Sequence, residues 1–189
     1  MFKILTFPNP ILRQRTEEVD GKDPKIQELV LAMLKFLKTA NKGKPLGVGL
    51  SAPQIGESKK IIVIYSPASR RFLSMLNPEI IWRSKRTRIG IPGRKNPFEG
   101  CLSVPGFWGK VRRPSVVKVF YQTPQGTPVI RKFRGFTAVI LQHEIDHLEG
   151  ILFIDRIKEQ EGKLYQLKKN KENREILEEI DISKVSCGI

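Results

Sequence analysis

The pattern of hydrophobic and polar positions predicts a helix near the start of the chain. Asp23 and Pro24 mark its beginning, because an acidic N-cap followed by proline suits the first turn of a helix. The residues that recur at the spacing of one helix face are Ile26, Leu29, Val30, Met33, Leu34 and Leu37. Gly43 and Pro45 would end this helix. Its apolar face carries no reactive side chain, so we expect it only to pack in the core.

Shorter runs of β-branched and aromatic residues predict strands. These runs are residues 60–66, 72–77, 79–82, 111–122, 129–133 and 151–157. A turn at 123–127 would join two of them as a hairpin. We also expect an irregular arm over residues 2–20, a surface loop over 83–97 and a short turn-bounded segment over 100–106.

A second helix is expected from about Thr137 to Glu149, with Gly150 as its stop. Its sequence is apolar nearly all the way round, which is typical of a buried helix. The apolar residues are Phe136, Ala138, Val139, Ile140, Leu141, Ile145 and Leu148. Because strands precede and follow it, the order of elements predicts an α+β fold in which antiparallel sheets pack around this central helix.

The chain has 189 residues, which is enough for one domain with its own core. We expect residues 1–157 to form the domain that carries the functional site and residues 158–189 to be its helical tail. The tail is polar, with a weak apolar stripe made of Leu164, Leu167, Ile176, Leu177 and Ile180.

Charge and composition narrow the class of protein. The formal net charge of +15 is concentrated in the middle of the chain, and such a surface favours RNA, ribosomes or other polyanions. The first twenty residues lack the apolar core of a secretory signal, and no apolar run is long enough for a membrane span. Two cysteines are too few for a disulfide framework. We therefore expect a cytoplasmic protein, or an organellar one whose transit peptide has been removed.

The segment Gln-His-Glu-Ile-Asp-His-Leu at 142–148 contains both histidines of the chain. His143 and His147 are one helical turn apart, so their imidazoles share a face and can bind one metal ion. Glu144 follows the first histidine, which is the position of the general base in His-Glu-x-x-His metal sites. Histidines and acids on a buried helix need partners, and a metal ion supplies one.

A catalytic metal site usually has three protein ligands, and no third histidine exists. Glu149, Asp155 and Glu159 are nearby acids, but Glu149 follows His147 by only two residues and would point elsewhere. Cys101 is the better candidate, since a thiolate is a strong ligand for zinc or iron. A small buried hydrophobe is the alternative interpretation of Cys101. Cys187 lies two residues from the C-terminus and is expected to be exposed.

Three segments, in their order along the chain, resemble the signature motifs of the peptide deformylases. They are Gly-Val-Gly-Leu-Ser-Ala-Pro-Gln at 47–54, Glu-Gly-Cys-Leu-Ser at 99–103 and Gln-His-Glu-Ile-Asp-His at 142–147. Pro-Asn-Pro-Ile-Leu-Arg at 8–13 is also similar to the N-terminal arm of that family. The resemblance covers most of residues 2–157 and implies the deformylase fold.

The resemblance also implies a reaction and a metal. The reaction is removal of the formyl group from the N-terminal formyl-methionine of nascent polypeptides, with release of formate. Cys101, His143 and His147 would bind one divalent ion, naturally Fe(II) in this family and often replaced by Zn, Ni or Co. Glu144 would move the proton.

By the same resemblance, the Gln54 amide and the Leu102 backbone N–H would stabilise negative charge on the formyl oxygen. Glu99 and Arg113 match an ion pair that braces the cysteine segment. The residues that match the methionine pocket are Val48, Phe136, Val139 and Ile140, and Gly47 and Gly49 would let the peptide backbone pair like a strand.

The sequence departs from the family pattern at three places. Ser51 replaces a usual alanine, and Trp108 stands where many bacterial members carry an arginine, so we assign Trp108 no substrate role. Residues 83–97 form a longer stretch than usual and could reshape the pocket rim or contact ribosomal RNA. The family's C-terminal helix can dock on the ribosome. The basic residues of the tail that favour such docking are Lys163, Lys168, Lys169, Lys171 and Arg174.

Two other functions use the same motif. A metallopeptidase would take a carboxylate or a histidine as its third ligand, so it would keep its metal without Cys101. An RNA-binding protein with a structural zinc would need a closed site of four ligands, and only Cys187 could supply a fourth soft ligand.

Overall fold

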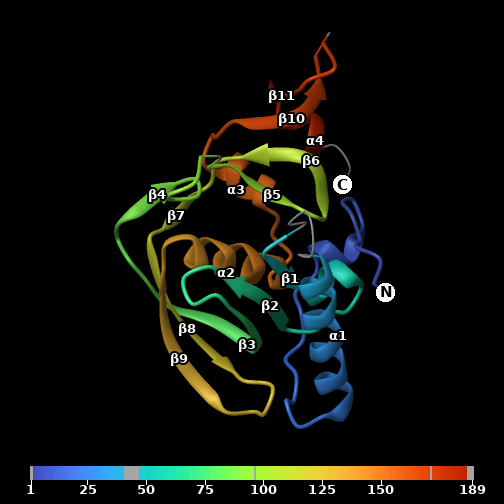
Figure 1. Ribbon diagram of the computed structural model, residues 1–189, viewed down its shortest axis with the longest axis vertical. Coiled ribbons are helices and arrows are strands. Elements are labelled where there is room, and N and C mark those ends of the chain that lie inside the picture. Colours follow the sequence, from blue (N-terminus) through green and yellow to red (C-terminus); the bar gives the residue numbers. More distant parts are fainter. Residues whose placement is uncertain (1, 41–46, 96, 171, 187–189) are drawn as a thin grey trace.

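The computed structural model describes residues 2–40, 47–95, 97–170 and 172–186. Its larger sheet is antiparallel and has the strand order β1-β2-β3-β8-β9. The strands are β1 (Gly49–Ser51), β2 (Ile61–Ser66), β3 (Arg71–Arg83), β8 (Val116–Gln122) and β9 (Pro128–Arg134). Helix α2 (Gly135–Leu148) crosses this sheet and lies between it and the rest of the strands (Figure 1).

The two halves of the larger sheet are buried differently. In β2, Ile62 and Ile64 pack against α2, while Ile61 and Val63 pack on the opposite side with helix α1 (Pro24–Ala40). This explains the uninterrupted apolar run of β2, because both of its faces are covered. In β8, residues alternate between buried and accessible, since only the α2 side of the strand is covered.

A smaller antiparallel sheet has the strand order β11-β10-β6-β5 and lies on the other side of α2 (Figure 1). Its strands are β5 (Glu99–Cys101), β6 (Val104–Gly109), β10 (Leu164–Lys169) and β11 (Glu175–Ile180). Helix α3 (Phe153–Glu159) packs beneath it through Phe153, Ile154 and Ile157. The remaining elements are the short pair β4 (Thr87–Ile89) and β7 (Arg112–Pro114), the 3-10 turns η1 (Pro10–Arg13) and η2 (Ala52–Ile55), and α4 (Ser183–Ser186).

The α+β fold with antiparallel sheets around a buried helix is confirmed. Both long helices begin within two residues of their predicted starts. The two segments around Pro78 form one continuous strand, β3, which is irregular near the proline. The predicted end of the first helix at Gly43 and Pro45 lies outside the described residues.

Two predictions near the C-terminus were wrong. Residues 151–157 do not form a strand, because Asp155 accepts a hydrogen bond from the Leu152 backbone N–H at 2.7 Å and caps α3. The tail is not mainly helical. Its first apolar residue, Leu164, pairs with Gly109 on β6, and this tertiary pairing draws residues 164–180 into a β-hairpin.

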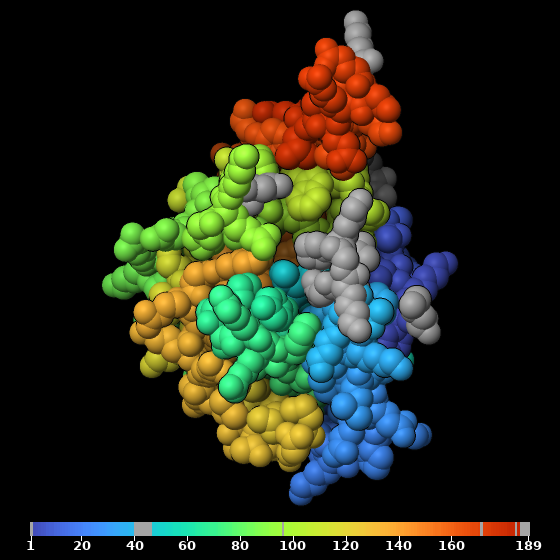
Figure 2. Space-filling model, in the orientation of Figure 1, coloured from blue at the N-terminus to red at the C-terminus, as the bar shows by residue number. Residues whose placement is uncertain are grey.

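The turn of that hairpin carries a local signal that the prediction missed. The side chain of Asn170 accepts hydrogen bonds from the backbone N–H groups of Glu172 and Arg174, and Asn173 has a positive φ of 59°. The predicted loop at 83–97 was also partly wrong, because residues 87–89 form β4 against β7. Figure 2 shows the hairpin, in red, projecting at one end of the molecule.

Candidate active site

Helix α2 presents the His-Glu-x-x-His motif inside the protein. Gly135 begins the helix with a positive φ of 63°, and nearly every later position is buried against one of the two sheets. His143 and His147 lie on one face of the helix, with ring centroids 5.1 Å apart. The helical period therefore places both imidazoles, as the sequence predicted.

Cys101 comes to the same place from the β5–β6 hairpin. Its Sγ lies 3.2 Å from His147 Nε2, and one ligand atom from each of Cys101, His143 and His147 lies within 4.8 Å of the other two. Ligands at ordinary metal–sulfur and metal–nitrogen distances in a tetrahedral site are about 3.6 Å apart. A thiolate with two imidazoles suits zinc or iron, so the three residues fit one divalent ion.

Carboxylates outside this set do not supply an alternative third ligand. The three acids considered from the sequence all face cations elsewhere: Asp155 with Arg13, Glu159 with Arg156, and Glu149 with Arg15. Cys187 lies outside the described residues. Within the described residues, the ligand set that could hold a metal is therefore Cys101, His143 and His147.

A buried chain of charges orients the first histidine. Glu99 Oε2 lies 3.1 Å from His143 Nδ1, which leaves the other ring nitrogen for the metal. Arg113 donates to both oxygens of Glu99, at 2.7 and 3.0 Å, and to Asp146 at 2.8 Å. The ion pair expected between Glu99 and Arg113 is therefore present, and it extends to the motif helix through Asp146.

The pKa values in this chain follow from burial and pairing. Burial alone would raise the pKa of Glu99, but Arg113 and His143 outweigh it and hold that pKa at about 2. Burial lowers the pKa of His147 well below its usual value, so its imidazole is neutral, the form that binds metal. Burial acts to lower the pKa of His143 too, yet hydrogen bonds with Cys101 and Glu99 raise it well above the usual value. The surroundings of His143 thus favour the protonated, positively charged form of its imidazole.

Glu144 faces the same space from the motif helix. Burial raises the pKa of Glu144 to about 7, while His143 and the Ser51 hydroxyl act against the rise. Its Oε2 is buried and has no hydrogen-bond partner in the part of the chain that the structure describes. A Cβ atom on Gly49 would lie 2.7 Å from Glu144 Cδ, so this glycine makes room for the carboxylate.

Gln54 is held by its carbonyl end. Its Oε1 accepts hydrogen bonds from the Ser51 backbone N–H at 2.9 Å and from the Ser51 hydroxyl at 3.1 Å. These contacts turn the amide nitrogen toward the cysteine segment, where it donates to Ser103 Oγ at 3.3 Å and to Cys101 Sγ at 3.5 Å. A hydrogen-bond donor is therefore fixed beside the metal ligands.

A cavity of about 460 Å³ opens over these groups. All the residues that the sequence proposed for substrate and catalysis line it: Gly47, Val48, Gly49, Gln54, Leu102, Phe136, Val139, Ile140 and Glu144. The structure thus brings together residues from β1 and the segment before it, from η2, from the β5–β6 turn and from α2, although their individual roles in substrate binding stay predictions.

The cavity wall also contains residues that sequence reasoning did not assign. Trp108 lies in the wall, and its ring packs so closely on Gly100 that a Cβ there would come within 2.6 Å of it. Arg94 stands 4.5 Å from the Phe136 ring centroid and is the only lysine or arginine among the described lining residues. The basic composition of 83–97 was the available signal for Arg94, but composition does not say which cation reaches the cavity.

The N-terminal arm connects the three motif segments. Its backbone N–H groups donate to the carbonyl oxygens of Gln54, Ser103 and Leu148, through Leu5, Phe7 and Thr16 respectively, at 2.8 to 2.9 Å. Each acceptor lies within or directly after one motif. The arm therefore has a structural role that its irregular sequence did not reveal.

Comparison with known proteins agrees with this geometry. A family model described as "Polypeptide deformylase" matches residues 1–163. The chain belongs to the polypeptide deformylase family. A peptide deformylase of Desulforudis audaxviator is 40% identical over 157 residues, which cover 82% of this chain and 93% of that protein.

Solved deformylase structures share the fold. The crystal structure of the Thermotoga maritima enzyme has a TM-score of 0.72 at 33% identity and covers 82% of this chain and 97% of that one. A class I type b peptide deformylase from Acinetobacter baumannii also has a TM-score of 0.72, at 38% identity, covering 82% of this chain and 99% of that one. The resemblance carried by the three motifs is thereby confirmed over most of the chain.

Proposed function

We propose that this chain is a metal-dependent deformylase that removes the formyl group from the N-terminal formyl-methionine of nascent polypeptides and releases formate. The observation that carries the proposal is that Cys101, His143 and His147 meet as one ligand set, of which Cys101 and His143 line a mainly apolar cavity together with Glu144. Membership of the deformylase family supports the same reaction.

One divalent metal ion belongs to this function, held by Cys101, His143 and His147. We propose Fe(II) as the native ion, with Zn, Ni or Co able to replace it, because a thiolate with two imidazoles suits these borderline metals. When bound, the ion acts as a Lewis acid and makes water a nucleophile near neutral pH.

Glu144 is the proton carrier in this proposal. It accepts a proton from the attacking water and returns it to the amine that leaves. Its unpartnered Oε2 supports the assignment, since a general base needs a free lone pair toward the substrate. Negative charge develops on the formyl oxygen, and the Gln54 amide and the Leu102 backbone N–H are assigned to stabilise it.

The substrate's methionine side chain would occupy the apolar part of the cavity. The residues assigned to this pocket are Val48, Phe136, Val139 and Ile140. Gly49 begins the edge strand β1 and Gly47 lies two residues before it, so an extended peptide could add to this edge as a further strand.

Formate release from formyl-Met-Ala-Ser by the Fe(II)-loaded protein tests the proposal. We expect turnover by the native chain and a loss of at least about 100-fold with Glu144→Ala, because general base catalysis contributes that much. Absence of formate from fully metallated protein would refute the deformylase assignment. Cys101→Ser tests the metallopeptidase alternative, which requires that this variant keep its metal.

We further propose that the protein is cytoplasmic, or organellar, and associates with the ribosome through its basic surface and C-terminal tail. None of the helices in the described residues is long and apolar enough to cross a membrane. Residues 158–189 are proposed to belong to the domain formed by residues 1–157, and the packing of Leu164 and Ile180 with α3 supports this.

Co-sedimentation with ribosomes at increasing salt tests the association. Deleting everything after Arg156 would also remove Ile157 and Leu164, which are fully buried, so point substitutions are the better probe. We expect binding to weaken as salt rises, and to weaken further with Lys168→Gln and Lys169→Gln if the tail takes part. Binding that ignores salt would contradict an electrostatic association.

A further inference from the structure

The positive charge of the chain is very unevenly distributed. Residues 80–143 contain thirteen Lys and Arg but a single Asp or Glu, which is Glu99. Glu99 is buried and paired with Arg113, so it offers no negative charge to the surface. The tail 158–189, by contrast, has seven basic and seven acidic residues. In the tail hairpin, Lys163 pairs with Glu179 and Lys168 with Glu178.

Most of this unbalanced charge lies around the uncovered half of the larger sheet. Helix α1 covers the outer face of β1, β2 and the start of β3, and no described helix packs on the outer face of β8 and β9. The exposed cations of this region are Arg83, Lys85, Arg86, Arg88, Lys118, Arg131, Lys132 and Arg134. None of these cations has an ion pair with a described carboxylate.

An aromatic residue lies among these cations. The strand register sets Trp82 of β3 beside Lys118 of β8, and Lys118 beside Lys132 of β9. The ammonium groups of Lys118 and Lys132 lie 5.9 and 6.0 Å from the Trp82 ring, within the range of cation–π attraction. The Trp82 side chain is nevertheless 45% exposed.

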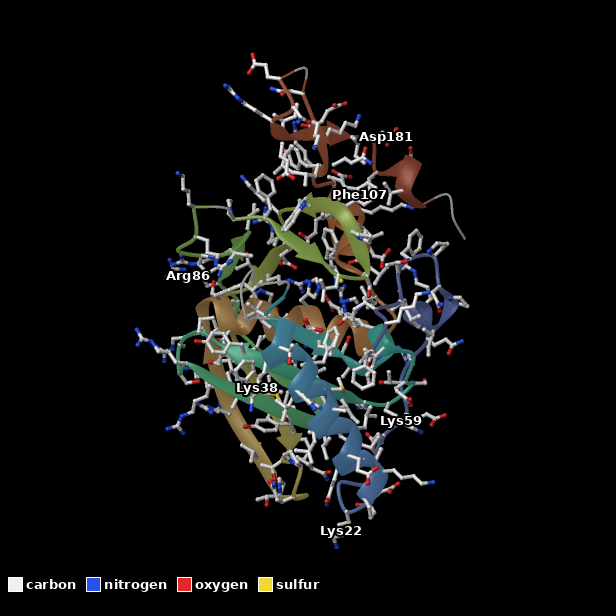
Figure 3. All side chains as sticks on the ribbon, turned by 45° about the vertical axis from the view of Figure 1, so that its right-hand side comes forward. Lys22, Lys38, Lys59, Arg86, Phe107 and Asp181 are labelled. Carbon is white, nitrogen blue, oxygen red and sulfur yellow. The ribbon has the colours of Figure 1, made fainter. Side chains whose placement is uncertain are left out.

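The group of exposed cations continues along the chain past the end of β3. Ser84 N–H donates to the Val116 carbonyl at 2.9 Å, and Ser115 N–H donates to the Arg86 carbonyl at 2.9 Å. The backbone that carries Arg86 and Arg88 is thus attached to the β8 side of the sheet, and Arg86 lies at the outer edge of the molecule (Figure 3). Charged side chains on the edge strand β9 also discourage aggregation. That role would require neither an exposed tryptophan nor a lysine on the interior strand β8.

We propose that this face, defined as Trp82, Lys118, Lys132, Arg134 and the adjoining Arg86 and Arg88, is a binding surface for single-stranded RNA. These cations would bind the phosphate backbone of the RNA, and that binding would release counterions. The Trp82 ring offers a flat platform for one base, and base–aromatic stacking adds to the affinity of such surfaces. Trp82, Lys118 and Lys132 lie on the side of the larger sheet opposite α2, because the alternating residues Val117 and Val119 pack with α2. RNA bound there and a peptide in the cavity would therefore not compete. The inference does not depend on the deformylase reaction.

Fluorescence anisotropy with a labelled uridine oligonucleotide of about 12 nucleotides tests the proposal, using the full chain with its metal. We expect the double variant Lys118→Glu/Lys132→Glu to weaken binding about tenfold or more, and to lower the salt slope by about 1.4 because two phosphate contacts are lost. Trp82→Ala should weaken binding about fivefold or more with an unchanged slope, while Trp82→Phe should keep most of the affinity.

The matched control is Lys22→Glu/Lys25→Glu, which makes the same change of net charge near the start of α1, far from Arg86 (Figure 3). It should bind RNA nearly as well as the native chain. Formate release from formyl-Met-Ala-Ser should stay unchanged in all these variants, which verifies that they fold. Equal weakening by the two double variants would overturn the proposal, as would a Trp82→Ala variant of native affinity. Binding to vesicles of equal parts neutral and anionic phospholipid, without binding to RNA, would instead assign the face to membranes and overturn it too.

Discussion

Gly49 and Glu144 are 95 positions apart in the chain, yet the glycine backbone lies against the glutamate carboxyl group. A methyl group on Gly49 would place its carbon 2.7 Å from Glu144 Cδ. The glycine of the first motif therefore makes room for Glu144, the proposed general base in the third motif, in addition to the peptide-pairing role that its sequence context suggests. The position of Glu144 depends on this contact between β1 and α2.

The first prediction is that Gly49→Ala moves Glu144 away from its working position. We expect kcat/KM for formyl-Met-Ala-Ser to fall about 100-fold, since small displacements of catalytic groups have effects of that size. Metal content should stay the same, because Cys101, His143 and His147 are not touched. Gly47→Ala is the matched control, since its added methyl group would meet Leu102 at an ordinary 3.4 Å. Equal losses in the two variants would contradict the explanation.

The second prediction concerns Glu99, which lies between Arg113 and His143. Glu99→Gln should weaken metal binding about 10- to 100-fold, because the orienting partner of a ligand histidine is impaired. It should also destabilise the protein by about 3 kcal/mol, since Arg113 loses the charge of its buried partner. Competition with a chelator and chemical denaturation measure the two effects. Glu17→Gln, which breaks only the exposed pair with Lys59, should change neither quantity appreciably.

The third prediction is that Arg94 selects peptides by charge, and it depends on the proposed function. Its guanidinium stands against Phe136 at the cavity, so an acidic residue after the formyl-methionine should be attracted to it. The native enzyme should prefer formyl-Met-Glu-Ser over formyl-Met-Lys-Ser, and Arg94→Gln should reduce that preference about three- to tenfold. Lys95→Gln is the control, because Lys95 does not line the cavity. An unchanged preference in Arg94→Gln would exclude this role, while turnover itself would still support the deformylase assignment.

The fourth prediction tests whether the C-terminal hairpin belongs to the core. Leu164 is fully buried against α3, whereas Leu167, three residues along the same strand, is 38% exposed. Leu164→Ala should lower the free energy of unfolding by about 2–5 kcal/mol. Leu167→Ala should cost at most about 1 kcal/mol. If the hairpin were an independent appendage, Leu164→Ala would leave the unfolding of the rest of the protein unchanged.

The sequence by itself determined those features that depend on local periodicity. The spacing of His143 and His147 fixes both imidazoles on one side of a helix, because the α-helical repeat leaves no other arrangement. The uninterrupted apolar run of β2 and the alternating pattern of β8 likewise record how many faces of each strand are covered. The three motifs, taken together, were specific enough to indicate the family.

Only the tertiary structure decided what depends on contacts between distant segments. The distance of 3.2 Å between Cys101 and His147 exists because the β5–β6 hairpin packs over α2, and no periodicity encodes that packing. The weak apolar stripe around Leu164 was compatible with a helix or a strand, and the accessible edge of β6 selected the strand. In the same way, Trp82, Lys118 and Lys132 are scattered in the sequence, and only the register of three strands sets them side by side.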